Sequence, residues 1–249
     1  MGLGKTLQAT TFFHYMHNQK PDARHLIVAP LSLVFNWKQE LEKFAPGLPF
    51  YVFHQGNRDV KEFMSSSARV MITSYGTLRS AVDELSLIHW NTVIIDESHN
   101  IKNPSAQITK AVYRLSATNR IGLSGTPVMN NTFDIYSQLN FMLPGLLGGP
   151  EFFKREYAIP IDRELNVEKT NALQKITAPF VLRRTKKQVA ADLPEKTESV
   201  LWCQMDEPQK EAYETIKKQI RSSIFLDIER DGFSKAKFGI LQGILKLRQ

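Results

Sequence analysis

The stretch Met1–Thr6 constrains the fold most, because Met-Gly-Leu-Gly-Lys-Thr matches the second half of a phosphate-binding loop. In such a loop, glycines let backbone N–H groups converge on phosphate oxygens, which makes Gly2 and Gly4 candidate nucleotide-binding residues. Lys5 is placed to reach the β- and γ-phosphates, and Thr6 is placed to bind Mg²⁺. The first glycine position of the full pattern would fall before Met1.

Apolar residues at helical spacing follow the loop directly, and they are Leu7, Phe12, Tyr15 and Met16. This spacing predicts a helix whose N-terminus faces the anion, because the first backbone N–H groups of a helix are unpaired and carry partial positive charge.

Five short apolar segments then predict strands, at His25–Ala29, Phe50–Phe53, Val70–Ser74, Thr92–Asp96 and Ile121–Ser124. The fourth is apolar on both faces, as a central parallel strand is. Strand and helix alternate along this part of the chain. The alternation predicts an α/β fold with three layers, helices covering both faces of a central, mostly parallel sheet.

Helices are predicted in the gaps between the strands. One begins near Pro30 and Ser32, and its apolar face is formed by Leu33, Trp37, Leu41 and Phe44. Three more are predicted at Gly76–Leu87, Ser105–Leu115 and Phe133–Met142. Ligands in parallel sheets bind beyond the carboxyl ends of the strands, and the motifs described below follow those ends.

The alternation of strands and helices ends after residue 143, where the loop Pro144–Pro150 begins, and the sequence that follows is mostly helical and more basic. We expect an ATPase lobe over residues 1–143, a helical insertion that returns to this lobe over 144–200, and a helical segment over 201–249. Asp206 and Gln209 predict the start of a long helix whose apolar face carries Tyr213, Ile216, Ile220 and Ile224. A last helix is predicted from about residue 235 to 249.

The second chemical motif is the acidic pair Asp96-Glu97 at the end of the fourth strand. Asp96 can hold Mg²⁺, directly or through water, and Glu97 can orient and deprotonate the water that attacks a γ-phosphate. An acidic pair after a strand is often only a helix start. The Gly-Lys-Thr loop about ninety residues upstream favours the catalytic interpretation, because both halves of a phosphoryl-transfer site are then present.

These motifs together resemble the first RecA-like lobe of the Swi/Snf family of DNA-dependent ATPases, within helicase superfamily two. The matching stretches cover about residues 1–200, in family order: Met1–Gln8, Ile27–Leu33 with Asn36-Trp37, Ile72–Leu78, Val93–His99 with Ile101–Pro104, Leu123–Pro127, and Leu182–Lys186 with Leu193-Pro194. The resemblance implies an ATP hydrolase that moves along double-stranded DNA, with ATP and Mg²⁺ as its nucleotide and metal.

The resemblance also implies roles for single residues. Lys5 and Glu97 are the catalytic pair, whereas His99, Ser124 and Thr126 match positions that link the nucleotide site to DNA. Positions that track the DNA backbone are Ser32, Ser74, Lys102 and Asn103. Backbone contact suits a motor that moves over any base sequence.

Three departures from the family pattern matter. Ser98 stands where the family usually has a small residue such as alanine. The strand before the phosphate loop and the adenine-reading segment are absent, as is the second RecA-like lobe with its arginine fingers. Because an arginine finger contributes roughly 10³–10⁵ in rate in comparable enzymes, we expect the chain as given to be nearly inactive as an ATPase. We expect a second lobe downstream in the parent protein.

Composition bears mainly on partners and compartment. A net charge of +7 favours a polyanionic partner such as nucleic acid, and the alternative is a charge that serves only solubility.

 The expected partners are double-stranded DNA, contacted through its backbone, and a DNA-bound protein complex. The single cysteine, Cys203, allows no disulfide framework and indicates a reducing compartment. No apolar run reaches the ~18 residues of a membrane span, so no membrane partner is expected.

Two alternatives stay open. One is another superfamily-two lobe, from a restriction translocase or an RNA helicase, which the segments Leu182–Lys186 and Ile101–Pro104 argue against. The other is a scaffold that binds nucleic acid without hydrolysis, which the intact Lys5, Asp96 and Glu97 argue against. The expected location is the nucleoid-associated bacterial cytoplasm, or the nucleus in a eukaryote.

Overall fold

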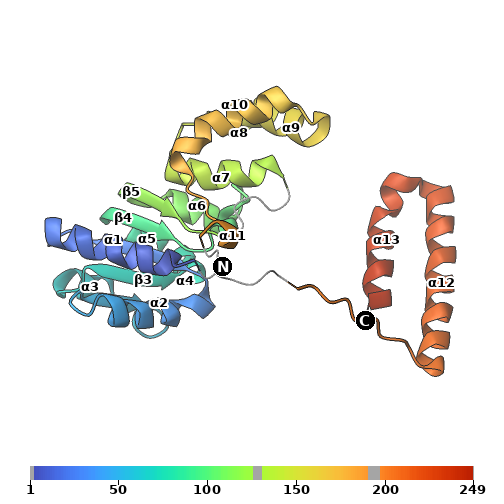
Figure 1. Cartoon of the computed structure of the whole chain (residues 1–249), viewed down its shortest axis with the longest axis horizontal. Helices are drawn as coiled ribbons and strands as arrows, with labels where there is room; N and C mark the ends of the chain where they lie inside the picture. The colour runs from blue at the N-terminus through green and yellow to red at the C-terminus, as the bar shows by residue number, and fades with distance from the viewer. Residues whose placement is uncertain (1–2, 126–130, 190–196, 249) are drawn as a thin grey trace. The chain divides into compact units, whose positions relative to one another are not determined.

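The computed structural model describes residues 3–125, 131–189 and 197–248, and contains two compact units, residues 1–191 and 192–249. Figure 1 shows the elements along the chain. The sheet of the first unit has five strands: β1 (His25–Ala29), β2 (Phe50–Phe53), β3 (Val70–Ser74), β4 (His89–Ile95) and β5 (Ser116–Gly122). Their order is β2-β3-β1-β4-β5, and every pairing is parallel. The predicted α/β fold is therefore confirmed.

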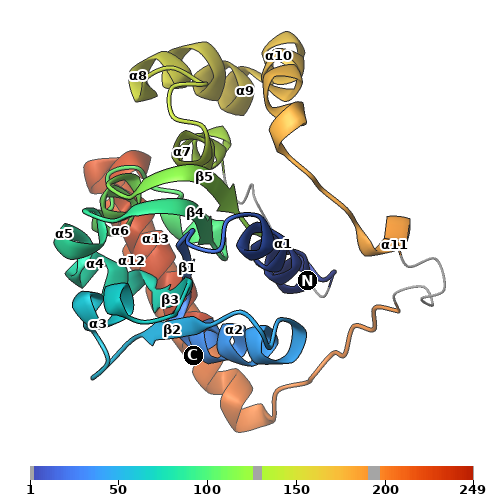
Figure 2. The ribbon, with the colours of Figure 1, turned by 90° about the vertical axis from the view of Figure 1, so that its left-hand side faces the viewer.

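Helices cover both faces of this sheet, which confirms the three-layer architecture (Figure 2). One face carries α1 (Lys5–Gln19) and α2 (Leu31–Phe44). The other carries α3 (Val60–Ser65), α4 (Tyr75–Ser80), α5 (Val82–Leu85) and α6 (Gln107–Tyr113). Strand β1 continues into α2 on the first face, whereas its neighbour β4 leads to α6 on the second. The connections after these two neighbouring strands thus go to opposite faces of the sheet. The crevice between such connections is the usual ligand position in parallel sheets.

The apolar faces of the first two helices differ from the prediction. In α1 the buried residues are Ala9, Thr10 and Phe13, whereas Leu7 and Tyr15 are exposed. In α2, Trp37 and Leu41 are buried as predicted. The third buried residue is Val34, and Phe44 is exposed. The sheet covers only a narrow stripe of each helix, so some large apolar side chains stay exposed. A prediction that selects the largest apolar residues therefore selects the wrong face.

Three predicted boundaries also change. The fifth strand is Ser116–Gly122, not Ile121–Ser124. It lies at the edge of the sheet and is half-exposed, so it contains polar residues and does not form the apolar run by which strands were predicted. The fourth strand begins earlier than predicted, at His89. The single helix predicted over Gly76–Leu87 is two short helices, α4 and α5, which meet at Ala81.

The rest of the first unit is helical. Helix α7 (Thr132–Met142) follows β5, and beyond it lie α8 (Pro150–Phe153), a π-helical turn (Lys154–Ala158), α9 (Ile159–Glu164), α10 (Val167–Thr177), a 3₁₀ turn (Ala178–Phe180) and α11 (Lys186–Val189). A separate apolar cluster holds this region together, with Tyr136 and Leu139 of α7 against Phe153 and Leu173. The helical extension therefore packs on α7.

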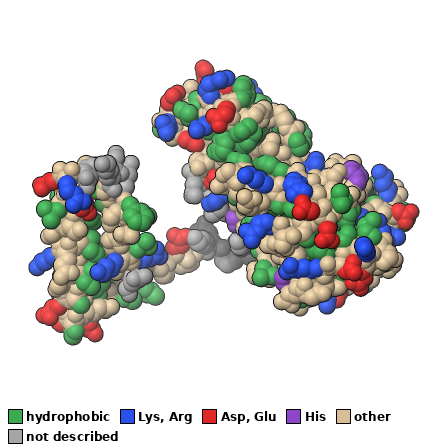
Figure 3. All heavy atoms as spheres, turned by 180° about the vertical axis from the view of Figure 1, so that it is seen from behind, with side chains coloured by type: hydrophobic (Ala, Val, Ile, Leu, Met, Phe, Trp, Pro, Cys, Tyr) green, Lys and Arg blue, Asp and Glu red, His purple; other side chains and the backbone are tan. Residues whose placement is uncertain are grey.

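The second unit is a helical hairpin of α12 (Glu207–Asp231) and α13 (Phe233–Arg248). Asp206 caps α12 by accepting a hydrogen bond from the backbone N–H of Gln209, as predicted. The close approach of the two helices depends on Gly243, since a Cβ there would meet the Ile220 side chain at 2.5 Å. Apolar side chains remain exposed on this hairpin, among them Phe225, Phe238 and Leu241 (Figure 3). The division into residues 1–143, 144–200 and 201–249 stays a prediction.

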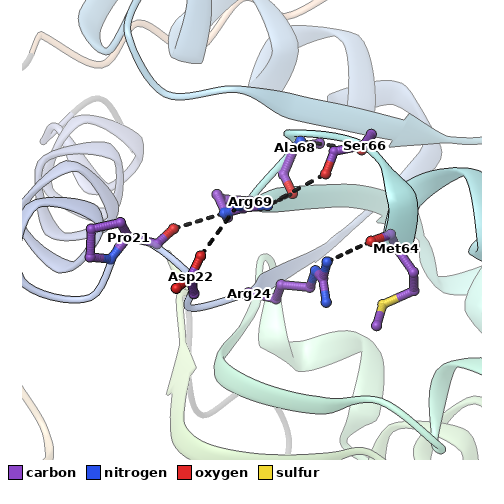
Figure 4. Close-up of polar contacts among 7 residues, drawn as sticks. All are labelled: Pro21, Asp22, Arg24, Met64, Ser66, Ala68 and Arg69. Atoms are coloured by element: carbon purple, nitrogen blue, oxygen red, sulfur yellow. Dashed lines mark hydrogen bonds and ion pairs between the residues drawn. The ribbon is translucent and has the colours of Figure 1, made fainter.

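Two arginines fasten the amino edge of the sheet (Figure 4). Arg69 donates from Nε to the Pro21 carbonyl oxygen at 2.7 Å, and its Nη2 lies 3.5 Å from Asp22 Oδ1. Arg24 donates from Nη2 to the Met64 carbonyl oxygen, also at 2.7 Å. These bonds tie the segment between α1 and β1 to the last turn of α3 and to the turn that follows it. None of the helices in the described part of the chain is long and apolar enough to cross a membrane.

Candidate functional site

Helix α1 begins at the carboxyl edge of the sheet. Its Phe13 ring lies 5.0 Å from the ring of His25, the first residue of β1. Lys5 is eight residues before Phe13, or about 12 Å along the helix axis, and β1 extends about 13 Å beyond His25. Because the helix runs back along the strand to reach its start, Lys5 lies near the level at which β1 ends.

The N-terminus of α1 suits an anion. Gly4 precedes the helix with φ 73° and ψ 26°, a left-handed conformation that favours glycine, and a Cβ there would meet nothing within 4 Å. In the described part of this segment no side chain caps the helix and no acidic residue occupies its first turn. Lys5 and Thr6 are half-buried. Gly2 lies outside the described residues, so its predicted role has no structural account.

Asp96 is held from both layers of helices. It is 7% exposed, and its Oδ2 accepts a hydrogen bond from Trp37 Nε1 of α2 at 2.9 Å. Its Oδ1 accepts from the Glu97 backbone N–H at 2.8 Å. On the opposite face, Tyr75 donates its hydroxyl proton to the Asp96 carbonyl oxygen at 2.7 Å. Burial, followed by the charges of Asp96 and Glu97, raises the pKa of the Tyr75 phenol, so this hydroxyl stays a donor.

Sequence reasoning missed Trp37 and Tyr75 as residues that orient this carboxylate. Both lie in stretches that match the family, Asn36-Trp37 and Ile72–Leu78. Trp37 was predicted only as part of an apolar helix face, and Tyr75 had no predicted role. Their contribution depends on the crossing of two helices and one strand, which the sequence does not specify directly.

Glu97 has a strained backbone. Its φ of 47° and ψ of 58° are left-handed, a conformation that costs a non-glycine residue on the order of 1–3 kcal/mol and concentrates at functional sites. Its side chain is 17% exposed, and Oε2 lies 3.3 Å from His99 Nδ1. Both atoms are buried, and neither makes a hydrogen bond. A carboxylate oxygen left in this state can accept a proton from a bound water.

The predicted coupling residues follow two neighbouring strands. Ser98 donates its backbone N–H to the Leu123 carbonyl oxygen at 2.8 Å, and Leu123 donates to the Ile95 carbonyl oxygen at 2.9 Å. These bonds extend the β4–β5 ladder and place Ser124 one residue beyond it. His99 lies in a 3₁₀ turn, η1 (Ser98–Ile101), directly after Glu97. Thr126 lies outside the described residues.

The four predicted DNA-contact residues also follow carboxyl ends of strands. Ser32 is exposed in the first turn of α2, after β1, and Lys102 and Asn103 follow the η1 turn. Ser74 ends β3 but is only 4% exposed, and its hydroxyl caps α4 by accepting from the Thr77 N–H at 3.1 Å. It also donates to Thr77 Oγ1. The structure therefore gives no exposed hydroxyl for a phosphate at residue 74.

The residues present fit ATP and Mg²⁺. Phosphate would meet the open N-terminus of α1 and Lys5, and Thr6 and Asp96 would be the protein ligands of Mg²⁺. Among the described residues, no group of three or more His, Cys, Asp and Glu side chains gathers to hold a metal. Mg²⁺ characteristically needs only one or two protein carboxylates, because phosphates and waters complete its shell.

The fold and this edge define a RecA-like nucleotide-binding lobe, and comparisons with known proteins give its family. The model of the SNF2-related domain matches residues 1–249, and the chain belongs to the SNF2-related family. The SWI2/SNF2 ATPase core of Sulfolobus solfataricus in complex with dsDNA is 38% identical, with a TM-score of 0.71 over 100% of this chain and 52% of that chain.

Curated relatives are much longer than this chain. YwqA of Bacillus subtilis is 38% identical over 225 residues, which cover 88% of this chain and 24% of the relative. The TATA-binding protein-associated factor MOT1 of Saccharomyces cerevisiae is 31% identical over 100% of this chain and 15% of its own length. The DNA repair and recombination protein RAD54B of Gallus gallus is 36% identical over 86% of this chain and 25% of its own length.

Proposed function

We propose that this chain is the first ATPase lobe of a motor that uses ATP hydrolysis to move along double-stranded DNA. The observation that carries the proposal is that an open helix N-terminus at Gly4–Thr6 and a buried, oriented carboxylate at Asp96 both belong to the carboxyl edge of the sheet. Family membership supports it, as does the likeness to a SWI2/SNF2 ATPase core in complex with dsDNA.

In this proposal the nucleotide binds at the start of α1. Backbone N–H groups at Gly2 and Gly4 and the ammonium group of Lys5 hold the phosphates. Thr6 and Asp96 hold Mg²⁺, which neutralises charge on the phosphate oxygens when bound. Trp37 and the Glu97 N–H keep the Asp96 carboxylate in one orientation toward that position.

Glu97 is the proposed general base. Its carboxylate orients a water and accepts the proton that the water loses as it attacks the γ-phosphate. His99 Nδ1, 3.3 Å from Glu97 Oε2, links this carboxylate to the turn that follows. His99, Ser124 and Thr126 are proposed to couple the nucleotide site to DNA.

DNA is proposed to cross the same edge of the sheet. Ser32, Lys102 and Asn103 are the side chains proposed to contact its phosphates. Ser74 is proposed to act indirectly, by capping α4 at the end of β3. Such contacts carry no base preference. A DNA-bound protein complex is the proposed target, and the bacterial nucleoid or the nucleus is the proposed location.

Phosphate release by the full-length protein tests this proposal, with double-stranded DNA, single-stranded DNA and RNA as separate stimulants. Stimulation by double-stranded DNA of any sequence, with displacement of a DNA triplex, is the expected result. The affinity of this chain alone for DNA, measured at rising salt, should give a log–log slope of about −1 to −4 if the lobe neutralises one to four phosphates. Stimulation by RNA alone would indicate an RNA helicase, and binding without turnover would indicate a scaffold.

A further inference from the structure

A buried polar contact joins the turn after Glu97 to helix α7. Ser98 Oγ donates a hydrogen bond to Gln138 Oε1 at 2.6 Å, and both residues are 2% exposed. We propose that Ser98 and Gln138 are a positioning pair, which holds the turn that carries Glu97 and His99 against α7. This inference rests on the proposed function of Glu97 and adds two residues that determine its orientation.

The orientation of the Gln138 amide is fixed from within its own helix. Its Nε2 donates to the Asp134 carbonyl oxygen at 3.1 Å, so Oε1 is the atom turned toward Ser98. A second bond reaches the other end of the turn, where Ser137 Oγ donates to the Ile101 carbonyl oxygen. Consecutive residues of α7 therefore hold both ends of the η1 turn.

Apolar residues surround these contacts. Ile101, Val112 and Phe141 belong to the adjoining core cluster and are at most 1% exposed. A hydroxyl and an amide buried among such residues are stable only when they are paired, so the pair specifies one relative placement of the two segments. An alanine at 98 and an apolar residue at 138 would fill similar space without this directional bond. The serine therefore adds orientation rather than volume.

The pair also connects the catalytic turn to the helical extension. On α7, Asp134, Ser137, Gln138 and Phe141 recur at the spacing of one helix face and lie toward the sheet. Tyr136 and Leu139 lie on another face, in the cluster with Phe153 and Leu173. A shift of the extension that rotates α7 would act on Ser98, and so on the peptide between Glu97 and Ser98.

The test is a double-mutant cycle in the full-length protein, with Ser98→Ala, Gln138→Met and the two combined. Each single variant removes the Ser98–Gln138 hydrogen bond, and we expect kcat for DNA-stimulated hydrolysis to fall about tenfold, the rate equivalent of one hydrogen bond. The KM for ATP should stay within about twofold, because the phosphate contacts at α1 are untouched. The double variant loses the same single bond, so its kcat should fall no further than that of one single variant.

Hydrogen exchange gives a readout that does not need turnover. Ser98→Ala should speed exchange of the amides at 97–101 about tenfold and leave those at 93–95 unchanged. A control, Ser66→Ala, removes a hydroxyl that donates to the Phe63 carbonyl oxygen at 2.9 Å near the amino edge, and should leave kcat unchanged.

Three outcomes would overturn the inference: unchanged kcat in all variants, losses that multiply in the double variant, or unchanged exchange at 97–101. If the wild-type protein itself failed to hydrolyse ATP, the proposed function would fail. The exchange measurement would still decide whether Ser98 holds the turn.

Discussion

The two edges of the sheet differ in how they use polar groups. At the carboxyl edge, Asp96 is a buried carboxylate with oriented donors, and Glu97 has a left-handed backbone and a buried oxygen without a hydrogen bond. At the amino edge, Arg69 and Arg24 satisfy carbonyl oxygens of the turns. A hollow of about 850 Å³ lies at this amino edge, lined by residues that include Met64, Leu87 and Ile88.

The comparison teaches that the hollow and the proposed nucleotide site lie at opposite edges of this sheet. Concave, apolar space is a common indicator of a binding site. Here strain, an oriented carboxylate and an open helix N-terminus gather at the other edge, where the ends of parallel strands diverge. Residues at the amino-edge hollow therefore provide matched controls for substitutions at Glu97 and Lys5.

Glu97→Gln should have the largest effect. The amide cannot accept a proton from water, so turnover should fall about 10²- to 10⁴-fold, with ATP binding retained. DNA-stimulated phosphate release and calorimetry with ATP and Mg²⁺ measure the two properties in the full-length protein. Glu84→Gln, at the amino-edge hollow, is the matched control and should leave both unchanged. Wild-type turnover in Glu97→Gln would show that another group activates the water.

Acid should destabilise the first unit through His25, at the start of β1. Burial, followed by the charge of His17, lowers the pKa of His25 to about 4 in the folded protein, against 6.5 unfolded. The unfolded chain therefore binds the proton more tightly. The stability contribution, about 3 kcal/mol, is fully present above pH 6.5 and is lost as the pH falls toward 4.

Chemical denaturation between pH 4 and 7 measures this loss. His25→Phe should flatten the pH dependence, because the ring packs against Phe13 without using either nitrogen in a hydrogen bond. His14→Gln, at an exposed position of α1, is the control and should keep the wild-type dependence. If His25→Phe retained the acid sensitivity, other groups would be responsible.

Lys5→Ala should weaken nucleotide binding by about 10- to 100-fold, since a hydrogen bond to a charged group contributes about 1.5–3 kcal/mol. Calorimetry with ATP and Mg²⁺ gives the dissociation constant. Lys61→Ala removes the same charge at the amino-edge hollow and should not change it. Equal losses in the two variants would indicate an effect of net charge rather than a phosphate contact at α1.

Arg69→Ala should have the smallest effect of the four and should act on stability alone. Losing its bonds to the Pro21 and Ala68 carbonyl oxygens should lower the free energy of unfolding by about 1–2 kcal/mol, with ATP turnover unchanged. Arg58→Ala is the control, because its guanidinium makes one long contact, 3.5 Å, with the exposed Ser80 hydroxyl. A loss of turnover in Arg69→Ala would mean that the two edges are coupled.

Local sequence signals were sufficient for the central strands and for the position of the acidic pair. The strands β1, β2 and β3 have the predicted bounds, because fully or half-buried strands are short apolar runs. The polar edge strand β5 was misplaced, since its burial is one-sided. The face of α1 was also misplaced, because Leu7 and Tyr15 are large and exposed whereas Ala9 and Thr10 are small and buried.

By itself, the sequence determined the α/β class, the parallel sheet and the motifs that belong to the SNF2-related family, because these depend on residue types at short spacing. Tertiary structure alone decided which side chains orient the site. Trp37 is 59 residues from Asp96 and Gln138 is 40 residues from Ser98, yet each pair is hydrogen-bonded. Such contacts arise from how helices cross the sheet, and a hydrogen bond needs its atoms placed to within a few tenths of an ångström, which no local pattern specifies.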